Sequence, residues 1–528
     1  MKRSCKLLAL LLAILLLTAS CGAQPAPGSA QPQSSQPQTS AQPEEEDTAP
    51  VVAGVDTEYP LEGDVVIAVN TSTDVEAQLP VGTLPSDLEA ASDPEQMSQG
   101  QGMPLDTPPM EPVSFEPGLQ IVGGDQVEQT YEIGQQKTIK TMDFYKRMMQ
   151  SFGDPEFADY DTSERLDVDI ELVYSGEYCT VWGQVSPIYN RPDIQVSLDE
   201  ETAKRIADEF DQKIYPLIVN IYGPLYDVDK DGKFALVCAD FVDYYNYEIY
   251  DNYYLQGYCN PPEDSATVEE GGNGTEMDMM VVDLWPTLFD ENNNLVEENW
   301  TLAMQTISHE VTHYVNFSAQ HLIPGKTQVL ESWIQESFTT FSESLYKGAM
   351  ASDIRGFYAE DANSVVANGR SPMQFQGMME DYALVNFFSL YLYEQTKDLE
   401  GGGFALFRKM VESNESDYRA IENALKEIGY PAIENALKEI GYPVTDFSEL
   451  MFNFRVALIA NEESGVYSFN RNENVQDLPV HLYRNADGEA DAKTLPAGGA
   501  IVFENVEGGF TPEGADDNIR FAAITFGE

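Results

Sequence analysis

The distribution of apolar and polar residues predicts strands before and after a central block of helices. Residues 166–185 alternate apolar and polar positions around a Ser-Gly turn, which is typical of a β-hairpin. Short continuous apolar runs within residues 226–241 and 273–286 indicate buried strands. Strand patterns return near the C-terminus, at residues 478–490, 499–506 and 519–526.

Longer segments in the middle of the chain have the spacing of apolar residues that helices require. Ser197 followed by Glu200 forms a capping-box pattern and predicts the start of the first helix. The predicted helices are residues 197–223, 299–320, 330–348 and 381–396. Strands followed by helices and then by strands predict an α+β protein.

The first 21 residues have the pattern of an export signal. Lys2, Arg3 and Lys6 precede the apolar run "LLALLLAILLL", and the segment ends in "TASC" at Cys21. This ending resembles a bacterial lipobox, in which Cys21 would be lipidated, with ordinary cleavage and free secretion as the alternative. We therefore expect an extracytoplasmic protein, in contact with the outer face of a membrane only through this lipid anchor, or secreted.

Composition divides the rest of the chain. Residues 22–118 are rich in Gln, Pro, Ser, Gly and acidic side chains, which predicts a mostly disordered tether with one strand-like run at 64–72. We expect a small β region at 119–185, the main body at 186–465 and a C-terminal β region at 466–528.

The segment "AIENALKEIGYP" occurs twice without change, at Ala420–Pro431 and at Ala432–Pro443. Each copy predicts a short helix ended by Gly-Tyr-Pro. Solenoid repeats are longer and diverged, so a recent duplication or an error in the sequence record fits better. We expect one copy to pack and the other to bulge outward.

The charge balance limits the partners. The chain has 89 acidic and 29 basic residues and a net charge of −60, which disfavours binding to nucleic acid or anionic lipid. Cys179, Cys238 and Cys259 are too widely spaced for a disulfide framework or a zinc knuckle. One disulfide and three buried thiols both remain open.

The segment "TISHEVTHYVNF" carries two of the four histidines. On a helix, His309 and His313 lie one above the other, so both rings can face one ion. Glu310 projects about 100° away, beside the open coordination position. The spacing predicts a zinc site with a glutamate base, and a closed structural zinc site is the alternative.

A catalytic zinc requires a third protein ligand and a position for water. One class of enzymes uses a histidine six residues beyond the second, but Ala319 occupies that position. The other class uses a glutamate of the next helix, and Glu336 lies 23 residues beyond His313 (336 − 313). Glu343, two turns further on, is a candidate to orient a ligand, whereas Glu331 is expected on the surface.

These two helices together resemble the hyicolysin-like neutral zinc metallopeptidases, which are gluzincin-type zincins. The resemblance rests on "TISHEVTHYVNF" and "SWIQESFTTFSE", and extends over about residues 166–460. It implies a zincin-like catalytic domain at 186–465, with His309, His313 and Glu336 as zinc ligands and Glu310 as base. Ser308 and Ser337 stand where the family commonly has alanine and glycine.

The resemblance implies an endopeptidase that hydrolyses protein or peptide substrates with a zinc-activated water and the Glu310 base. A further donor should face the developing oxyanion, and Tyr382 is a candidate, with a packing role as the alternative. The other reading is a non-catalytic surface-binding lipoprotein that keeps the fold. The sequence leaves the substrate preference, the oligomeric state and any pro-segment role open.

The segment "DVDKDG" resembles the first half of a calcium loop. Asp227, Asp229 and Asp231 alternate ahead of Gly232, as calcium ligands do. The twelfth position is Cys238 rather than glutamate, which excludes an EF-hand. A Ca²⁺ site and a plain polar turn both remain open, and the turn is the preferred interpretation.

Overall fold

The architecture is that of a computed structural model of the 528-residue chain. The signal segment, Cys21 and most of the expected tether lie outside the residues that it describes. The described residues are 23–25, 50–55, 59–79, 130–151, 155–161, 163–186, 196–241, 253–265, 271–350, 358, 362–367, 369–430, 446–470, 472, 494–504, 509–512 and 514–526.

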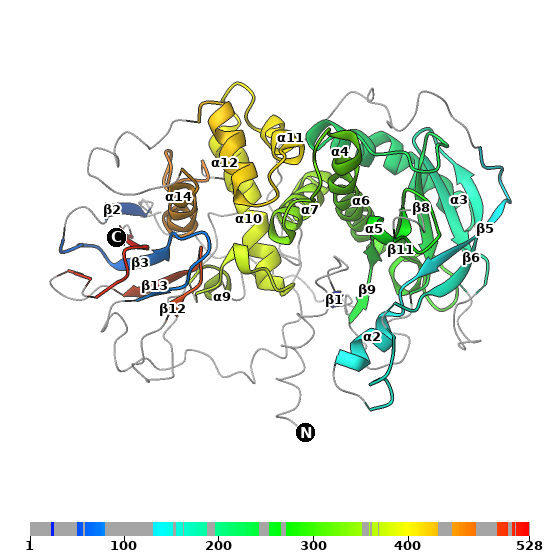
Figure 1. Ribbon diagram of the computed structural model, residues 1–528, viewed down its shortest axis with the longest axis horizontal. Helices are drawn as coiled ribbons and strands as arrows, with labels where there is room; N and C mark the ends of the chain where they lie inside the picture. The colour runs from blue at the N-terminus through cyan, green and yellow to red at the C-terminus, as the bar shows by residue number, and fades with distance from the viewer. Residues whose placement is uncertain are drawn as a thin grey trace, which may run out of the picture.

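A six-stranded mixed sheet lies at one end of the molecule (Figure 1). Strand β8 pairs in parallel with β7 and β11, and the other pairs are antiparallel. Because β5, β6 and β7 share this sheet with β8 and β11, the described part of residues 119–185 does not form a separate β region. In spatial order the strands are β10 (Gly257–Tyr258), β11 (Met279–Asp283), β8 (Phe234–Ala239), β7 (Cys179–Gln184), β6 (Leu166–Ser175) and β5 (Gln136–Thr141).

The central helices lie between this sheet and a second sheet (Figure 1). The central ones are α6 (Trp300–Leu322), α7 (Ser332–Lys347) and α10 (Met379–Thr396), and α7 contacts both others. The other helices in the described residues are α2 (Phe144–Ser151), α3 (Glu200–Glu209), α4 (Tyr215–Ile221), α5 (Pro261–Asp264), α9 (Ala362–Val366), α11 (Phe404–Glu412), α12 (Tyr418–Glu427) and α14 (Asp446–Ala460).

Shorter helical turns lie beside several of these helices. A π-helical turn at Phe210–Ile214 joins α3 to α4. A second turn spans Leu284–Leu288, but Trp285 within it has an extended backbone conformation. Single 3₁₀ turns occupy Glu297–Asn299, directly before α6, and Pro372–Gln374.

The first helix begins later than the sequence predicts. Asp199 is the N-cap residue of α3, and its carboxylate accepts a hydrogen bond from the backbone N–H of Thr202 at 2.8 Å. The prediction that Ser197 caps this helix is therefore wrong, because the aspartate two residues later satisfies the free N–H group instead.

The second sheet joins the two ends of the chain. Its strand order is β13 (Ala500–Glu504), β3 (Val65–Asn70), β14 (Ile519–Thr525) and β2 (Val51–Val55), all antiparallel. Strand β3 is fully buried between two C-terminal strands. The expected tether is therefore corrected for residues 51–79, which are part of the folded body and complete the C-terminal β region.

Two short pairs of strands complete the β structure. Strand β4 (Ala77–Gln78) pairs with β12 (Thr494–Leu495), which again links the two ends of the chain. Strand β1 (Ala23–Pro25) pairs with β9 (Tyr253–Leu255), which directly precedes β10.

A continuous apolar core connects both sheets through the helices. It includes Ile67 of β3, Cys238 of β8, Ile307 of α6 and Phe388 of α10. Most residues of α6 and α10 are buried on all sides of the helix, in keeping with their central positions, although α6 also buries polar side chains. The α+β fold class predicted from the sequence is confirmed.

Two smaller sequence predictions have structural answers. Cys179, Cys238 and Cys259 are buried free thiols, so the interpretation as three thiols is correct. The first copy of the duplicated segment lies in α12, which packs its apolar side into the core, and the second copy lies outside the described residues.

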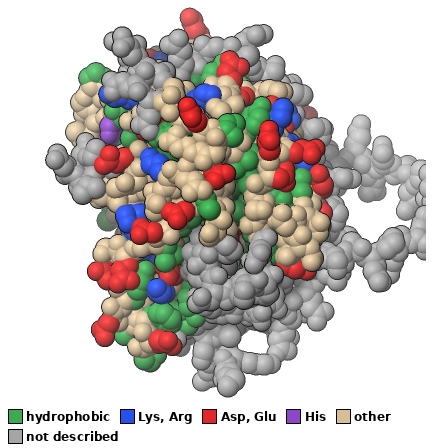
Figure 2. Space-filling model, turned by 90° about the vertical axis from the view of Figure 1, so that its right-hand side faces the viewer, with side chains coloured by type: hydrophobic (Ala, Val, Ile, Leu, Met, Phe, Trp, Pro, Cys, Tyr) green, Lys and Arg blue, Asp and Glu red, His purple; other side chains and the backbone are tan. Residues whose placement is uncertain are grey.

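The described helices include none that is long and apolar enough to span a bilayer. Acidic side chains are spread over the face at the six-stranded sheet, with fewer basic ones among them (Figure 2).

Candidate metal centre

Helix α6 carries the HExxH motif in a buried position. It contacts β10 and β11 on one side and α7 on the other. Thr306 Oγ1 lies 3.0 Å from Gln256 Oε1, which ties the helix to the segment between β9 and β10. His309, Glu310 and His313 are all buried, with 2–7% of their surface exposed.

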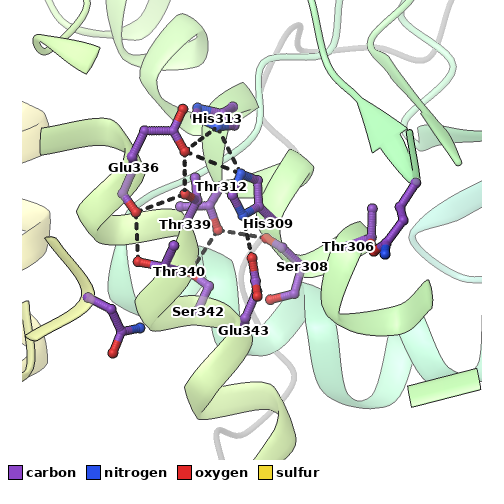
Figure 3. Close-up of polar contacts among 12 residues, drawn as sticks. Thr306, Ser308, His309, Thr312, His313, Glu336, Thr339, Thr340, Ser342 and Glu343 are labelled. Carbon is purple, nitrogen blue, oxygen red and sulfur yellow. Dashed lines mark hydrogen bonds and ion pairs between the residues drawn. The ribbon is translucent and has the colours of Figure 1, made fainter. Parts of the chain in front are cut away.

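Both histidines of α6 face Glu336 of α7 (Figure 3). His309 Nε2 and His313 Nε2 lie 3.3 Å apart. Glu336 Oε2 lies 3.4 Å from the first nitrogen and 3.7 Å from the second. The two helices therefore bring three ligand atoms into one compact triangle.

The triangle matches the ligand set of a zinc site. Two imidazole nitrogens and one carboxylate oxygen at about 2.0–2.2 Å from a tetrahedral ion lie about 3.3–3.6 Å from one another. The observed separations of 3.3, 3.4 and 3.7 Å are close to these values. Within the described residues the metal-ligating group at this position has three members, which fits a site with a coordination position left for water.

The far nitrogen of His309 is held by Glu343. Glu343 Oε1 lies 2.5 Å from His309 Nδ1. In the neutral imidazole that a metal requires, the proton on Nδ1 is donated to this carboxylate, and the Nε2 lone pair is directed at Glu336 and His313. Burial acts to lower the pKa of His309, but the contacts with Glu336 and Glu343 outweigh it and raise the pKa well above the usual value.

Neighbours on α7 hold the other two ligands. His313 Nδ1 lies 3.5 Å from Gln335 Oε1, and the Gln335 amide donates to the Leu330 carbonyl at 2.7 Å. Thr339 Oγ1 donates to Glu336 Oε2 at 3.3 Å. Burial acts to raise the pKa of Glu336, but the two histidines outweigh this effect and hold it at about 2. Glu336 is therefore an ionised ligand.

A hydrogen bond between hydroxyl groups connects α6 and α7 close to the ligands. Thr312 Oγ1 and Ser342 Oγ share a hydrogen bond of 2.8 Å between the two helices. Thr312 Oγ1 also donates to the Ser308 carbonyl of its own helix at 2.8 Å. Ser337 Oγ donates to the Ile334 carbonyl of its own helix. The serines at 308 and 337 are thus fully buried in the helix pair and leave all three ligands in place.

Glu310 lies toward the edge of the sheet. A Cβ placed on Gly257 of β10 would be 3.5 Å from Glu310 Cγ, so this carboxylate lies close to the backbone of the edge strand. Burial, followed by the charge of Glu310, raises the pKa of the neighbouring Cys259 thiol well above its usual value. Cys259 therefore stays neutral beside the motif glutamate.

Tyr382, His321 and Glu331 are not members of the metal-ligating group. Tyr382 is in α10 and meets Phe375 edge-on at a centroid distance of 5.1 Å, and its assignment as an oxyanion donor stays a prediction. His321, at the exposed end of α6, stacks on Tyr226. Glu331 is exposed and precedes α7.

Three functional positions were missed by sequence reasoning. Gln335 and Thr339 contact the ligands, but each is an ordinary helix residue, and its partner depends on how α7 is rotated against α6. Asp278 joins Asp227 and Asp229 in a second acidic group, whereas Asp231 is not a member of that group. The segment "EMDMMVVD" gives no sign of this because Asp278 lies about 50 residues from the loop.

Comparison with known proteins agrees with the site. No protein-family profile matches the chain. The chain is 26% identical over 366 residues to the neutral metalloprotease ShpI of Staphylococcus hyicus, and the match covers 69% of this chain and 74% of that protein. This similarity to a metalloprotease agrees with the buried His309, His313 and Glu336 group, whose side chains are suited to hold a metal ion.

Proposed function

We propose that this chain is a zinc-dependent endopeptidase that acts on extracellular protein. The observation that carries the proposal is the convergence of His309 and His313 from α6 with Glu336 from α7, next to Glu310. The donor set and its spacing favour zinc among divalent ions. The similarity to a neutral metalloprotease supports the same class of reaction.

The proposed ligands and the proposed base have separate roles in peptide hydrolysis. His309, His313 and Glu336 would hold Zn²⁺, which when bound supplies Lewis acidity and lowers the pKa of water. The Glu310 carboxylate takes a proton from the attacking water as the new C–O bond forms. It then delivers that proton to the nitrogen of the departing amine as the C–N bond breaks.

The direct test is cleavage of an unbiased peptide library by the purified protein. Activity should disappear with a zinc chelator and return when Zn²⁺ is added back. Glu310→Gln should lower kcat about 10²–10⁴-fold and keep one zinc per chain, because it removes the base and no ligand. Glu298→Gln, an exposed acid directly before α6, is the matched control and should keep full activity.

Two results would reject this function. Cleavage that persists in a metal-free protein would exclude a metal-dependent mechanism. A biological effect that survives Glu310→Gln unchanged would favour the alternative, a surface protein that binds its partner without cutting it.

We also propose that the mature protein is attached to the outer face of a bacterial membrane through a lipid on Cys21. The basic and apolar segments before "TASC" support export, and the Pro- and Gln-rich stretch after it suits a spacer. Labelled fatty acid should be incorporated by the full chain and not by Cys21→Ala. Equal labelling of both proteins would reject the anchor.

A further inference from the structure

A second acidic group lies at the end of the six-stranded sheet at which the neighbouring strands β8 and β11 begin. The loop at residues 226–233 leads into β8, and Asp278 directly precedes β11. The two strands are parallel neighbours, with Met279 opposite Ala235. The Ala235 N–H donates to the Asp278 carbonyl at 2.8 Å. The sheet therefore brings a loop and a distant aspartate to one place.

Three carboxylates converge there. One oxygen each of Asp227, Asp229 and Asp278 lies within 4.8 Å of the other two. Asp278 is 1% exposed and Asp227 is 6% exposed. Backbone N–H groups fix one oxygen of each: Gly232 donates to Asp227 Oδ2 at 3.1 Å, and Val228 donates to Asp278 Oδ1 at 3.3 Å.

The other oxygens of these two side chains have no hydrogen bond in the described part of the protein. They are Asp227 Oδ1 and Asp278 Oδ2, and both are buried. A buried carboxylate oxygen without a donor is costly unless a cation or another donor meets it. These two buried oxygens without a donor distinguish the group from an ordinary acidic turn.

The surrounding protein offers little compensating charge. Tyr131 donates its hydroxyl hydrogen to Asp229 Oδ2 at 2.8 Å. Lys137 is near enough for Asp229 and Asp278 to favour its charged form, but burial is the larger effect and lowers its pKa. Burial, then the charges of Asp229, Asp227 and Asp231, raises the pKa of Asp278 well above its usual value. Burial and repulsion between the carboxylates therefore disfavour the charged form of Asp278.

We propose that Asp227, Asp229 and Asp278 bind a structural calcium ion. All donors are oxygens, which hard cations prefer and zinc does not require. Loop residues and nearby carbonyls suit the irregular coordination of Ca²⁺ better than the strict octahedron of Mg²⁺. The site is separate from the His309, His313 and Glu336 group in both residues and donor type.

The calcium loop is joined to the helix of the metal centre. The Tyr226 N–H donates to Ser318 Oγ at 2.9 Å, and the Tyr314 hydroxyl donates to the Tyr226 carbonyl at 2.8 Å. The Tyr226 ring also stacks on His321 at a centroid distance of 4.6 Å. An ion that fixes this loop would therefore stabilise the packing of α6, next to His313.

The test measures calcium on the zinc-loaded protein, so that it does not depend on proteolysis. Equilibrium dialysis with radioactive calcium should give one tightly bound Ca²⁺ per chain, and saturating calcium should raise Tm by about 5 °C. Asp278→Asn should abolish the tight binding and the Tm shift. Asp264→Asn, a buried acid before the same strand but outside the group, should keep both.

Terbium luminescence gives a second measurement. Tyr131 lies against Asp229, so its excitation should sensitise a bound Tb³⁺ ion, and added Ca²⁺ should displace the signal. If Asp278→Asn does not fold, Asp229→Asn in the loop takes its place. Absence of tight calcium binding, equal binding by the Asp278 or Asp229 variant, or tighter binding of Mg²⁺ would overturn the proposal.

Discussion

His309 is held from both sides of its ring. Glu343 lies 2.5 Å from Nδ1, while Nε2 faces Glu336 at 3.4 Å. The first carboxylate selects the tautomer and fixes the ring plane, and the second supplies the shared ligand oxygen. Two carboxylates of α7 thus contact the two nitrogens of one histidine. Glu343 orients the ring, and Glu336 is a candidate ligand of the same metal ion.

This arrangement predicts the effect of Glu343→Ala. Zinc affinity should fall about 10–100-fold, because the His309 ring loses the acceptor that orients it and strengthens its basicity. Competition with a chelator of known affinity measures the change. Glu412→Ala, an exposed glutamate at the end of α11, should bind zinc like the parent protein. Equal affinities of both variants would show that Glu343 does not support the ligand.

Gly257 provides a second residue-level prediction. A Cβ at this position would lie 2.6 Å from Thr306 Cγ2 and 3.1 Å from the Val281 carbonyl, so α6 or β11 would have to move. Gly257→Ala should cost about 1–3 kcal/mol of unfolding free energy and lower cleavage, because Glu310 lies beside the same atoms. Urea unfolding measures the loss.

Gly54→Ala is the control for this substitution. Its Cβ would meet only Leu61 Cδ2, at 3.4 Å, which is ordinary van der Waals contact. A Gly257→Ala protein that unfolds at the same urea concentration as Gly54→Ala would contradict the close packing of β10 against α6.

The centre of the site could be predicted from sequence because local geometry determines it. The helical period places His309 and His313 on one face, and the need for a third ligand on the next helix selects Glu336. Gln335 and Thr339 could not be predicted. Their contacts depend on the rotation of α7 about its axis, which is set by packing over its whole length.

At the scale of elements, the central fact is the position of β3. This strand lies between β13 and β14, with Ile67 opposite Val502 and Ala522. Periodicity predicts the strands themselves, since each is a short apolar run. Periodicity does not predict a partner 435 residues away (502 − 67). The Pro- and Gln-rich sequence around β3 is also typical of a tether, so composition assigns this strand to the wrong region.

Removal of this strand should unfold the second sheet. A chain that begins at residue 51 loses only the short β1–β9 pair among the described strands and should melt close to the mature protein, whereas one that begins at residue 130 should lose several degrees in Tm and bind a hydrophobic dye. The reason is that β13 would lose its neighbour β3 and β14 would lose both β3 and β2, which would expose the buried residues Val502 and Ala522. Equal melting of the two chains would mean that residues 51–79 only dock on the body.

At the scale of the whole molecule, repulsion between acidic side chains destabilises the compact state. The chain has a net charge of −60, and acidic side chains are spread over the face in Figure 2 instead of forming one patch. Such a surface favours solubility and weakens the compact state by self-repulsion. Buried acids add to this effect, because each must be neutral or paired with a cation inside the protein.

Asp264 makes the effect of pH on the fold measurable. Burial raises its pKa from 3.8 to about 8, despite a hydrogen bond from Asn273. Between these two values the folded state keeps a proton that the unfolded state has released. The unfolding free energy should therefore fall as pH rises through this range, with a contribution of about 1.4 kcal/mol per pH unit from this group.

Asp264→Asn isolates this contribution because an amide does not titrate. Urea unfolding of both proteins at a series of pH values between 5 and about 8 gives the difference in slope. The parent should lose stability relative to the variant at every step upward, and the difference should level off above the folded pKa. Parallel curves would mean that Asp264 is ionised in the folded protein, and that Asn273 and Arg165 stabilise its charge more than burial opposes it.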